Sequence, residues 1–296
     1  MILGHEKQWE FLKRTALSGK LSHAYLFSGP EHLGKKTIAL EWVHLLLNEI
    51  APSDFSGEAP HPDLILIEPE NKEIQIGQIR DLIWKLSLKP YAAPLKITLI
   101  DKAHLMNQEA QNCFLKTLEE PKKNTLIILI TEYPETLLPT IFSRCEQIKF
   151  YPVKKEKIIS YLKEGDLPEE EIKKIATVSM GRPGTAIDLI KNPQQLKDFE
   201  SEIKEIVKIS KSDLAQRFQY AKDLSQLEEP LKILNIWLFY FRDMLLKKYL
   251  SADAQVSNHS FSKIKSTIKT IQNTIFLMAN TNVNSRLALE ILMLNF

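Results

Sequence analysis

The chain has 296 residues, 44% of them hydrophobic and 26% charged, with a net charge of +2. These proportions are ordinary for a soluble globular protein of one to three domains, and the near-neutral charge gives no global electrostatic case for binding nucleic acid. The two cysteines, Cys113 and Cys145, make neither a disulfide framework nor a metal-ligand set, which fits a reducing compartment.

The first 37 residues predict a helix, a strand and a loop that could hold phosphate. Residues 6–18 favour a helix, and the charges at the amino terminus interrupt the apolar core that a signal peptide needs. The apolar run 24–28 predicts a strand that leads directly into the loop 29–37, GPEHLGKKT, and a helical pattern follows. This order of strand, glycine-bounded loop and helix is the arrangement that holds phosphate in P-loop proteins.

The loop keeps the spacing G-x-x-x-x-G-K through Gly29, Gly34 and Lys35. Glycines let backbone N–H groups approach a phosphate, and the start of the helix adds partial positive charge. The next position should carry Ser or Thr to bind magnesium, but it is Lys36, and Thr37 comes one residue late. The loop is therefore either a nucleotide site or a strand-to-helix turn that is kept for its shape.

Residues 50–62 read as a loop without a metal site. His61 is the only candidate ligand there, no cysteine lies nearby, and its place before Pro62 and Asp63 is typical of a turn. Residues 64–67 predict the next buried strand. Apolar residues at helical spacing over 76–86 predict a helix that packs on the sheet.

The stretch 96–121 has the outline of an ATPase. The apolar run 97–100 indicates a strand covered on both faces, and Asp101 puts a carboxylate at its carboxyl end, where open α/β sheets bind ligands. In nucleotide-hydrolysing P-loop proteins an acidic pair stands here, of which the first orients magnesium and the second polarises water. The second position is Lys102, which cannot accept a proton from water and repels magnesium. A helix then follows, and Pro121 ends it.

Two further positions stand out before residue 151. Residues 125–130 predict a third apolar strand that ends at Thr131, which either contacts a γ-phosphate or water or simply terminates the strand. Arg144 lies between Ser143 and Cys145. Its forked, permanently charged guanidinium suits triphosphate recognition, whereas composition alone would make it a surface arginine.

From residue 151 onward the pattern is helical. Residues 154–178 predict two short helices split at 165–168, residues 185–190 predict a further helix, and all elements after residue 198 are helical. An aromatic-rich face over 231–245 is either core or a subunit interface. The closing helix, 271–296, is apolar enough to be buried. The apolar stretch 233–246 is too short to cross a bilayer and contains charges, so we expect a cytoplasmic protein with no membrane partner.

Several motifs together resemble one family. They are His23-Ala-Tyr-Leu-Phe-Ser-Gly-Pro30, Gly34-Lys35, His61-Pro-Asp63, Leu99-Ile-Asp-Lys-Ala-His104, Ala110-Gln111, Leu115-Lys-Thr-Leu-Glu-Glu-Pro121, Leu137-Leu-Pro-Thr-Ile141 and Ser143-Arg-Cys145. In this order and spacing they resemble the AAA+ clamp-loader subunits of bacterial DNA polymerase III. The resemblance is strong over residues 1–190, and the last third is similar only in pattern. LKTLEEP and SRC are specific to clamp loaders, whereas a P-loop alone is a weak signal.

The resemblance implies an architecture in three parts. An α/β AAA+ P-loop core, with a parallel sheet flanked by helices, would span residues 1–150. A small helical lid would span 151–197, and an all-α collar that assembles a five-subunit ring would span 198–296. Arg144, with Ser143 and Cys145, would be an arginine finger that acts on ATP held by a neighbouring subunit.

The departures from the family pattern are informative. Lys36 replaces the magnesium-binding residue and Lys102 the acid that activates water. Thr185 stands near the position of a lid arginine in motor subunits, with Arg182 close by. The four zinc-binding cysteines of many relatives are absent between Glu49 and Asp63. We therefore expect no zinc, no required cofactor and little or no hydrolysis in cis, and we leave open whether ATP or ADP binds.

The main hypothesis is a stator of the clamp loader that lends Arg144 to a neighbour and helps to place a sliding clamp on primed DNA. Its partners would be the motor subunits (gamma or tau) and the delta subunit of the ring and, through the complex, the clamp and the DNA. The alternative is a motor ATPase of the same family. A stand-alone DNA-binding module is a third reading, which the near-neutral charge opposes.

Overall fold

The computed structural model describes residues 3–50, 61–250, 260–281 and 283–296. The chain divides into two compact units, residues 1–188 and 189–296. The predicted loop at 50–62 lies almost wholly outside the described residues. The helices predicted for a lid belong largely to the first unit, and the division into three domains stays a prediction.

The first unit is built on a five-stranded sheet in the order β2-β3-β4-β1-β5. The strands are β1 (Ala24–Ser28), β2 (Leu64–Ile67), β3 (Lys96–Ile100), β4 (Thr125–Thr131) and β5 (Glu146–Lys149), and every pair is parallel. Every residue of β1 and β3 is buried, because helices cover both faces of the sheet. The parallel order places the carboxyl ends of all five strands along one edge.

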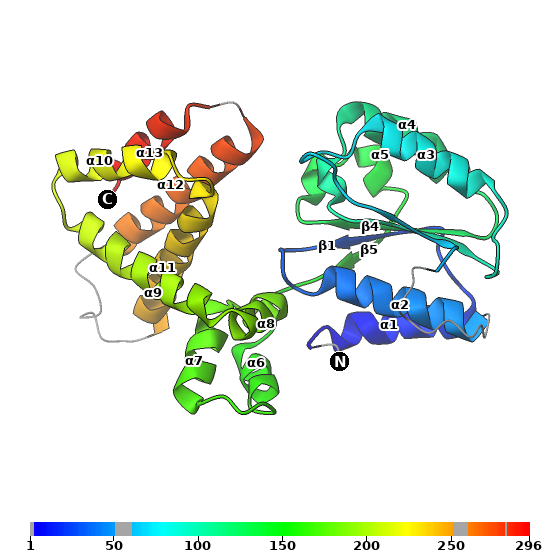
Figure 1. Ribbon diagram of the computed structural model, residues 1–296, viewed down its shortest axis with the longest axis horizontal. Helices are drawn as coiled ribbons and strands as arrows, with labels where there is room; N and C mark the ends of the chain where they lie inside the picture. The colour runs from blue at the N-terminus through cyan, green and yellow to red at the C-terminus, as the bar shows by residue number, and fades with distance from the viewer. Residues whose placement is uncertain (1–2, 51–60, 251–259, 282) are drawn as a thin grey trace. The chain divides into compact units, whose positions relative to one another are not determined.

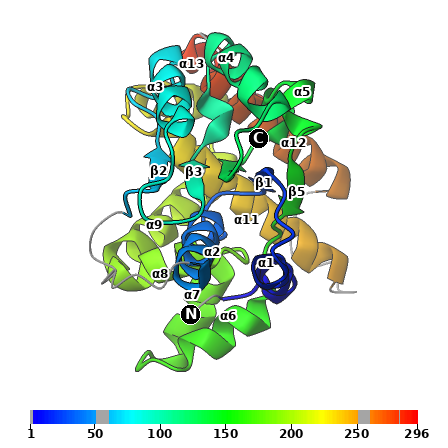
Figure 2. The same ribbon diagram turned by 90° about the vertical axis from the view of Figure 1, so that its right-hand side faces the viewer.

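The helices form one layer on each face of this sheet. The helices α1 (Glu6–Ser18) and α2 (Lys35–Ile50) lie on one face, and α3 (Ile76–Ser87), α4 (Gln108–Glu119) and α5 (Pro139–Phe142) lie on the other (Figure 1, Figure 2). Trp42 is fully buried in the first layer, where its indole N–H donates to the Leu12 carbonyl at 2.8 Å and so ties α2 to α1. Phe114 is fully buried in the second layer.

One predicted strand differs from its observed setting. Residues 64–67 do form a strand, but only Ile67 is buried and Leu66 is 44% exposed. The prediction of a buried strand was wrong because β2 stands at the edge of the sheet, where one side has no neighbouring strand. An apolar run does not distinguish an edge strand from a central one.

Three short helices follow, of which the third runs across the boundary between the two units, and the two predicted over 154–178 are both present. They are α6 (Lys155–Leu162), α7 (Glu169–Val178) and α8 (Pro183–Lys191). Gly181 joins this part to the core, since its carbonyl accepts from the Val153 N–H at 2.7 Å. A Cβ at Gly181 would lie 2.5 Å from the Val153 carbonyl oxygen, so only glycine permits the approach.

The second unit is helical over its described residues. It contains α9 (Pro193–Ser210), α10 (Leu214–Ser225), α11 (Pro230–Leu250), α12 (Phe261–Asn280) and α13 (Ser285–Met293). The predicted aromatic face belongs to its core, where Trp237 is fully buried and packs edge-on against Phe296 with ring centroids 5.6 Å apart.

The prediction of a single closing helix over 271–296 was wrong. It is two helices, because α12 ends at Asn280 and Asn284 begins α13 by accepting from the Leu287 N–H at 3.1 Å. With this change, the predicted fold class is confirmed: a P-loop α/β core of AAA+ type is followed by a helical lid segment and a helical C-terminal unit.

Candidate functional site

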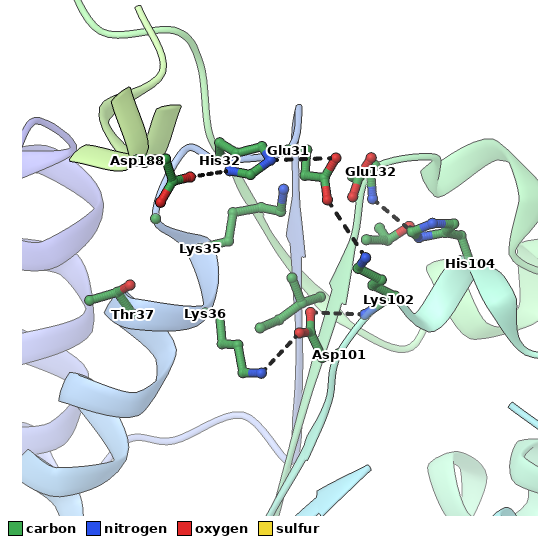
Figure 3. Close-up of a pocket in the computed structure, with 14 residues that line it drawn as sticks. Glu31, His32, Lys35, Lys36, Thr37, Asp101, Lys102, His104, Glu132 and Asp188 are labelled. Atoms are coloured by element: carbon green, nitrogen blue, oxygen red, sulfur yellow. Dashed lines mark hydrogen bonds and ion pairs between the residues drawn. The ribbon is translucent and has the colours of Figure 1, made fainter. Parts of the chain in front are cut away.

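A cleft of about 330 Å³ opens at the carboxyl ends of the strands in the first unit (Figure 3). It is lined by Glu31, His32, Gly34, Lys35, Lys36, Thr37, Asp101, Lys102, His104, Ile130, Thr131, Glu132, Gly184 and Asp188. The loop after β1, the residues after β3 and the end of β4 all meet here because these strands are neighbours in the parallel sheet. Open α/β sheets bind ligands at this edge. All the predicted nucleotide-site residues except Gly29 line the cleft.

The P-loop has the backbone conformation that its glycines allow. Gly29 has φ +146° and Gly34 has φ +84°. A Cβ at Gly29 would lie 2.3 Å from the Phe150 carbonyl oxygen, so this glycine is required by the close passage of the chain after β5. A Cβ at Gly34 would meet nothing within 4 Å, so its side faces open space. The loop therefore presents a free backbone surface at the start of α2.

Lys35 is turned back onto its own loop. Its ammonium donates to the Gly29 carbonyl at 2.7 Å and to the Pro30 carbonyl at 2.6 Å, and the residue is only 6% exposed. Burial lowers the pKa of the Lys35 ammonium, and nearby carboxylates, Glu132 first among them, oppose that shift. The loop carbonyls thus provide the oxygen contacts that the oxygens of a bound phosphate would otherwise make.

Lys36 lies where a magnesium-binding residue would stand. Its ammonium is 3.3 Å from Asp101 Oδ2 and is hydrogen-bonded to Glu68, the residue directly after β2. Burial tends to lower the pKa of Lys36, but the hydrogen bond to Glu68 and the charge of Asp101 outweigh it and raise the pKa. Figure 3 shows Lys36 pointing toward Asp101, with Thr37 apart from this pair. A fixed cation therefore lies at the carboxylate that would orient magnesium.

Lys102 occupies the second position of the predicted acidic pair. It adopts a left-handed conformation, with φ +52°, and its ammonium is 3.6 Å from Glu31 of the P-loop. Its backbone N–H donates to Asp101 Oδ1 at 2.9 Å, which fixes the aspartate between two lysines. Because this residue is a lysine, the site has no carboxylate here to accept a proton from water, as a hydrolytic P-loop site requires.

The end of β4 contributes a buried polar group to the cleft. Thr131 is 1% exposed, accepts from the Tyr133 N–H at 3.1 Å, and lies 3.4 Å from His104 Nδ1. Burial, together with the charges of Lys102 and Lys35, lowers the pKa of His104 to about 4, so this imidazole is neutral at pH 7. Burial also raises the pKa of Glu132. The Thr131 hydroxyl therefore has partners within the protein, and the Thr131 side chain also lines the cleft.

The segment at α8 packs on the P-loop. The Gly184 N–H donates to the His32 carbonyl at 2.8 Å, and His32 Nδ1 lies 3.3 Å from Asp188. A Cβ at Gly184 would be 2.8 Å from the same carbonyl. Arg182, noted in the sequence beside Thr185, is near enough for its charge to lower the pKa of both Lys35 and Glu132. The segment at α8 therefore closes one side of the cleft.

Arg144 is not among the residues that line the cleft. It follows α5, and its side chain is 34% exposed. The guanidinium donates to Glu119 Oε1 at 2.8 Å and to the Thr140 carbonyl at 3.0 Å. Cys145 is a packing residue, since it is 8% exposed and burial raises the pKa of its thiol to about 12. The structure thus separates Arg144, with Ser143 and Cys145, from the predicted nucleotide-site residues.

Comparison with known proteins decides the family. The family model described as DNA polymerase III, delta subunit, matches residues 4–154. The DNA polymerase III subunit delta' of Pseudomonas aeruginosa is 30% identical over 269 residues, which cover 83% of this chain and 79% of that protein. The chain belongs to the DNA polymerase III delta subunit family. The predicted resemblance to subunits of bacterial DNA polymerase III is confirmed, and two of the relatives are its subunit delta'.

Other relatives of this family member include two from Bacillus subtilis. Its subunit delta' is 28% identical, with 93% of this chain and 91% of the relative covered. Its subunit tau is also 28% identical, but the match covers 83% of this chain and half of the relative. Among solved structures, a gamma-subunit-related protein of Thermotoga maritima has a TM-score of 0.49 at 20% identity, with 97% of both chains covered. At this similarity that fold adds nothing to the family assignment.

Within the described part of the chain, no group of three or more His, Cys, Asp or Glu side chains could hold a metal ion. The same residues contain no helix that is long and apolar enough to span a membrane.

Sequence reasoning did not select five residues that the structure places beside the predicted site residues. They are Glu31, Glu68, Glu119, His104 and Glu132, which pair with or surround the predicted residues. Glu68 had a usable signal, because it follows an apolar strand directly, as Asp101 does. Glu31 and Glu119 lie in the motifs 29–37 and 115–121, but the spacing in these motifs does not indicate which residue each would pair with.

Proposed function

We propose that this protein is a delta-prime stator of a bacterial clamp loader, which has no ATP hydrolysis of its own and lends Arg144 to a neighbouring motor subunit. In this role it helps to place the sliding clamp on primed DNA during replication in the cytoplasm. The family assignment supports the setting. The stator role is carried chiefly by the Lys36–Asp101 ion pair, which puts a lysine where hydrolysis needs magnesium.

The position of Arg144 supports its action on a neighbour. The side chain is partly exposed and stands outside the cleft of its own subunit. An arginine finger supplied in trans stabilises charge on the γ-phosphate in the transition state, and it raises rates by roughly 10³ to 10⁵ in other phosphoryl-transfer systems. The partners are then the gamma or tau motor subunits and the delta subunit in a ring of five, with the clamp and DNA reached through the complex. No zinc or other cofactor is needed for this role.

The runner-up is a motor ATPase like gamma or tau. It is favoured by the intact spacing of Gly29, Gly34 and Lys35 and by the match to a tau subunit. It is opposed by Lys36 and Lys102. Lys36 offers magnesium no ligand in the P-loop, and Lys102 cannot act as the base that activates water.

A steady-state ATPase assay on the isolated full-length protein separates these two functions. We expect turnover with magnesium to equal that of a Lys35→Ala variant, which lacks the phosphate-binding lysine and serves as the background. Turnover well above this background, abolished by chelating magnesium, would establish a motor ATPase and refute the stator.

A further inference from the structure

The Lys36 ammonium is held by two carboxylates that the sheet places side by side. Ile67 and Ile100 are directly paired in the parallel register of β2 and β3, and Glu68 and Asp101 are the residues that follow them. Lys36, in the first turn of α2, contacts both. Two carboxylates at adjacent strand ends beside a P-loop form a site for a cation, and the chain fills that site with its own side chain.

Magnesium does not fit these residues. It requires near-octahedral oxygen ligands at about 2.0–2.1 Å, and the hydroxyl that a P-loop normally offers is replaced here by an ammonium 3.3 Å from Asp101 Oδ2. A dication could approach Asp101 only if Lys36 gave up both carboxylates. The repulsion between the two cations makes that exchange unfavourable.

The phosphate-binding surface is nevertheless kept. Gly34 retains its left-handed backbone and faces open space, and Lys35 lies in the loop with its ammonium on two carbonyls that a phosphate could replace. The cleft of about 330 Å³ lies within the size range of small-molecule sites. Lys36 adds a second positive charge next to Lys35, on the side where the metal would neutralise the phosphates.

We propose that the cleft binds a nucleoside diphosphate or triphosphate without a metal ion, with the Lys36 ammonium in the place of magnesium. This inference rests on the proposed stator function, because a stator needs a nucleotide only as a structural ligand. Glu68 and Asp101 hold the ammonium in position, and when a ligand arrives its phosphate oxygens share that ammonium with them. Binding is then not weakened by chelators, unlike binding to a site where magnesium bridges protein and phosphate.

The test is equilibrium binding of a fluorescent ATP analogue, and of the corresponding ADP analogue, to the full-length protein in EDTA and in excess magnesium. We expect magnesium not to strengthen wild-type binding: the Kd in excess magnesium should equal or exceed the Kd in EDTA, because Lys36 repels the magnesium complex of the nucleotide. Lys36→Thr restores a hydroxyl and removes the cation. We expect its Kd in EDTA to rise about tenfold or more, the cost of losing a charge-assisted contact, and magnesium to reverse that loss.

Lys7→Thr is the matched control, because Lys7 is an exposed lysine on α1, away from the cleft. It should bind as the wild type does in both conditions. Wild-type binding that magnesium strengthens tenfold would overturn the proposal, as would a metal-insensitive Lys36→Thr protein or a wild type that binds neither nucleotide in EDTA. The comparison of wild-type binding in EDTA and in magnesium does not depend on whether any variant folds. These outcomes leave the action of Arg144 untouched, since that is measured on a neighbour's ATP.

Discussion

At the scale of single residues, lysines at two positions change the chemistry of the site. Lys36 stands at the magnesium-ligand position and Lys102 at the position of the base, yet both are paired with carboxylates. Each lysine therefore belongs to a local ion pair and does not leave an unbalanced charge in the cleft. The loop keeps its shape and loses the groups that hydrolysis uses.

The guanidinium of Arg144 is held at two points, by Glu119 and by the Thr140 carbonyl. We expect Glu119→Gln to lower the ATPase rate of the assembled complex by about tenfold, because a misplaced group loses part of its transition-state stabilisation. The unfolding free energy should change by less than about 1 kcal/mol, since the pair is partly exposed and such pairs contribute little.

The neighbouring exposed residue supplies the control for this prediction. Glu120→Gln removes the same charge one position further along the chain, so both variants should assemble and unfold alike. If the two variants also gave equal ATPase rates in the complex, Glu119 would have no role in positioning Arg144.

At the scale of elements, the segment between α3 and β3 is held by two buried charges. Asp63 is fully buried and accepts from the N–H groups of Tyr91, Ala92 and Ala93 at 2.7–2.8 Å. Lys96 is 7% exposed and donates to three carbonyls at the end of α3 and just after it, at 3.1–3.3 Å. This arrangement fixes the start of β3 and, through it, the position of Asp101.

We expect Asp63→Ala to lower the free energy of unfolding by about 2–4 kcal/mol, because it leaves one buried and two part-buried N–H donors without their acceptor. Burial tends to raise the pKa of the Asp63 carboxyl, but the three N–H groups lower it below its ordinary value. Its contribution is therefore present above the unfolded pKa, near 3.8, and is lost as the pH falls through the lower folded value.

Urea denaturation near neutral pH measures the effect. Asp81→Ala, on an exposed position of α3, is the control and should change the free energy of unfolding by less than about 0.5 kcal/mol. An Asp63→Ala protein as stable as that control would show that the three hydrogen bonds do not hold this segment.

The elements also show what sequence can and cannot predict. Strands such as 24–28 and 97–100 were predictable because apolar runs ending in a polar residue have few other interpretations. The edge position of β2 was not, because strand order is set by tertiary packing. The meeting of Lys36 with Glu68 depends on that order as well, since it brings together residues 32 positions apart. Asn284 as a helix cap could have been predicted, because asparagine is a favoured start for a helix.

At the scale of the whole molecule, the cleft and the proposed arginine finger lie in different places. The cleft holds Lys35, Lys36 and Asp101, while Arg144 lies outside it and is partly exposed. In a ring, one subunit's arginine can then serve the next subunit's nucleotide even when its own cleft does not hydrolyse. The central claim of the proposed function is that Arg144 acts in this way.

The most direct test uses the reconstituted clamp loader with clamp and primed DNA. ATPase and clamp-loading rates are compared for wild type, Arg144→Ala and Arg80→Ala, the last removing an exposed arginine on α3. With assembly verified by gel filtration, Arg144→Ala should lower both rates by about one to several orders of magnitude, and Arg80→Ala should leave them unchanged. Unchanged rates for an assembled Arg144→Ala complex would contradict the claim and leave Arg144 a structural partner of Glu119.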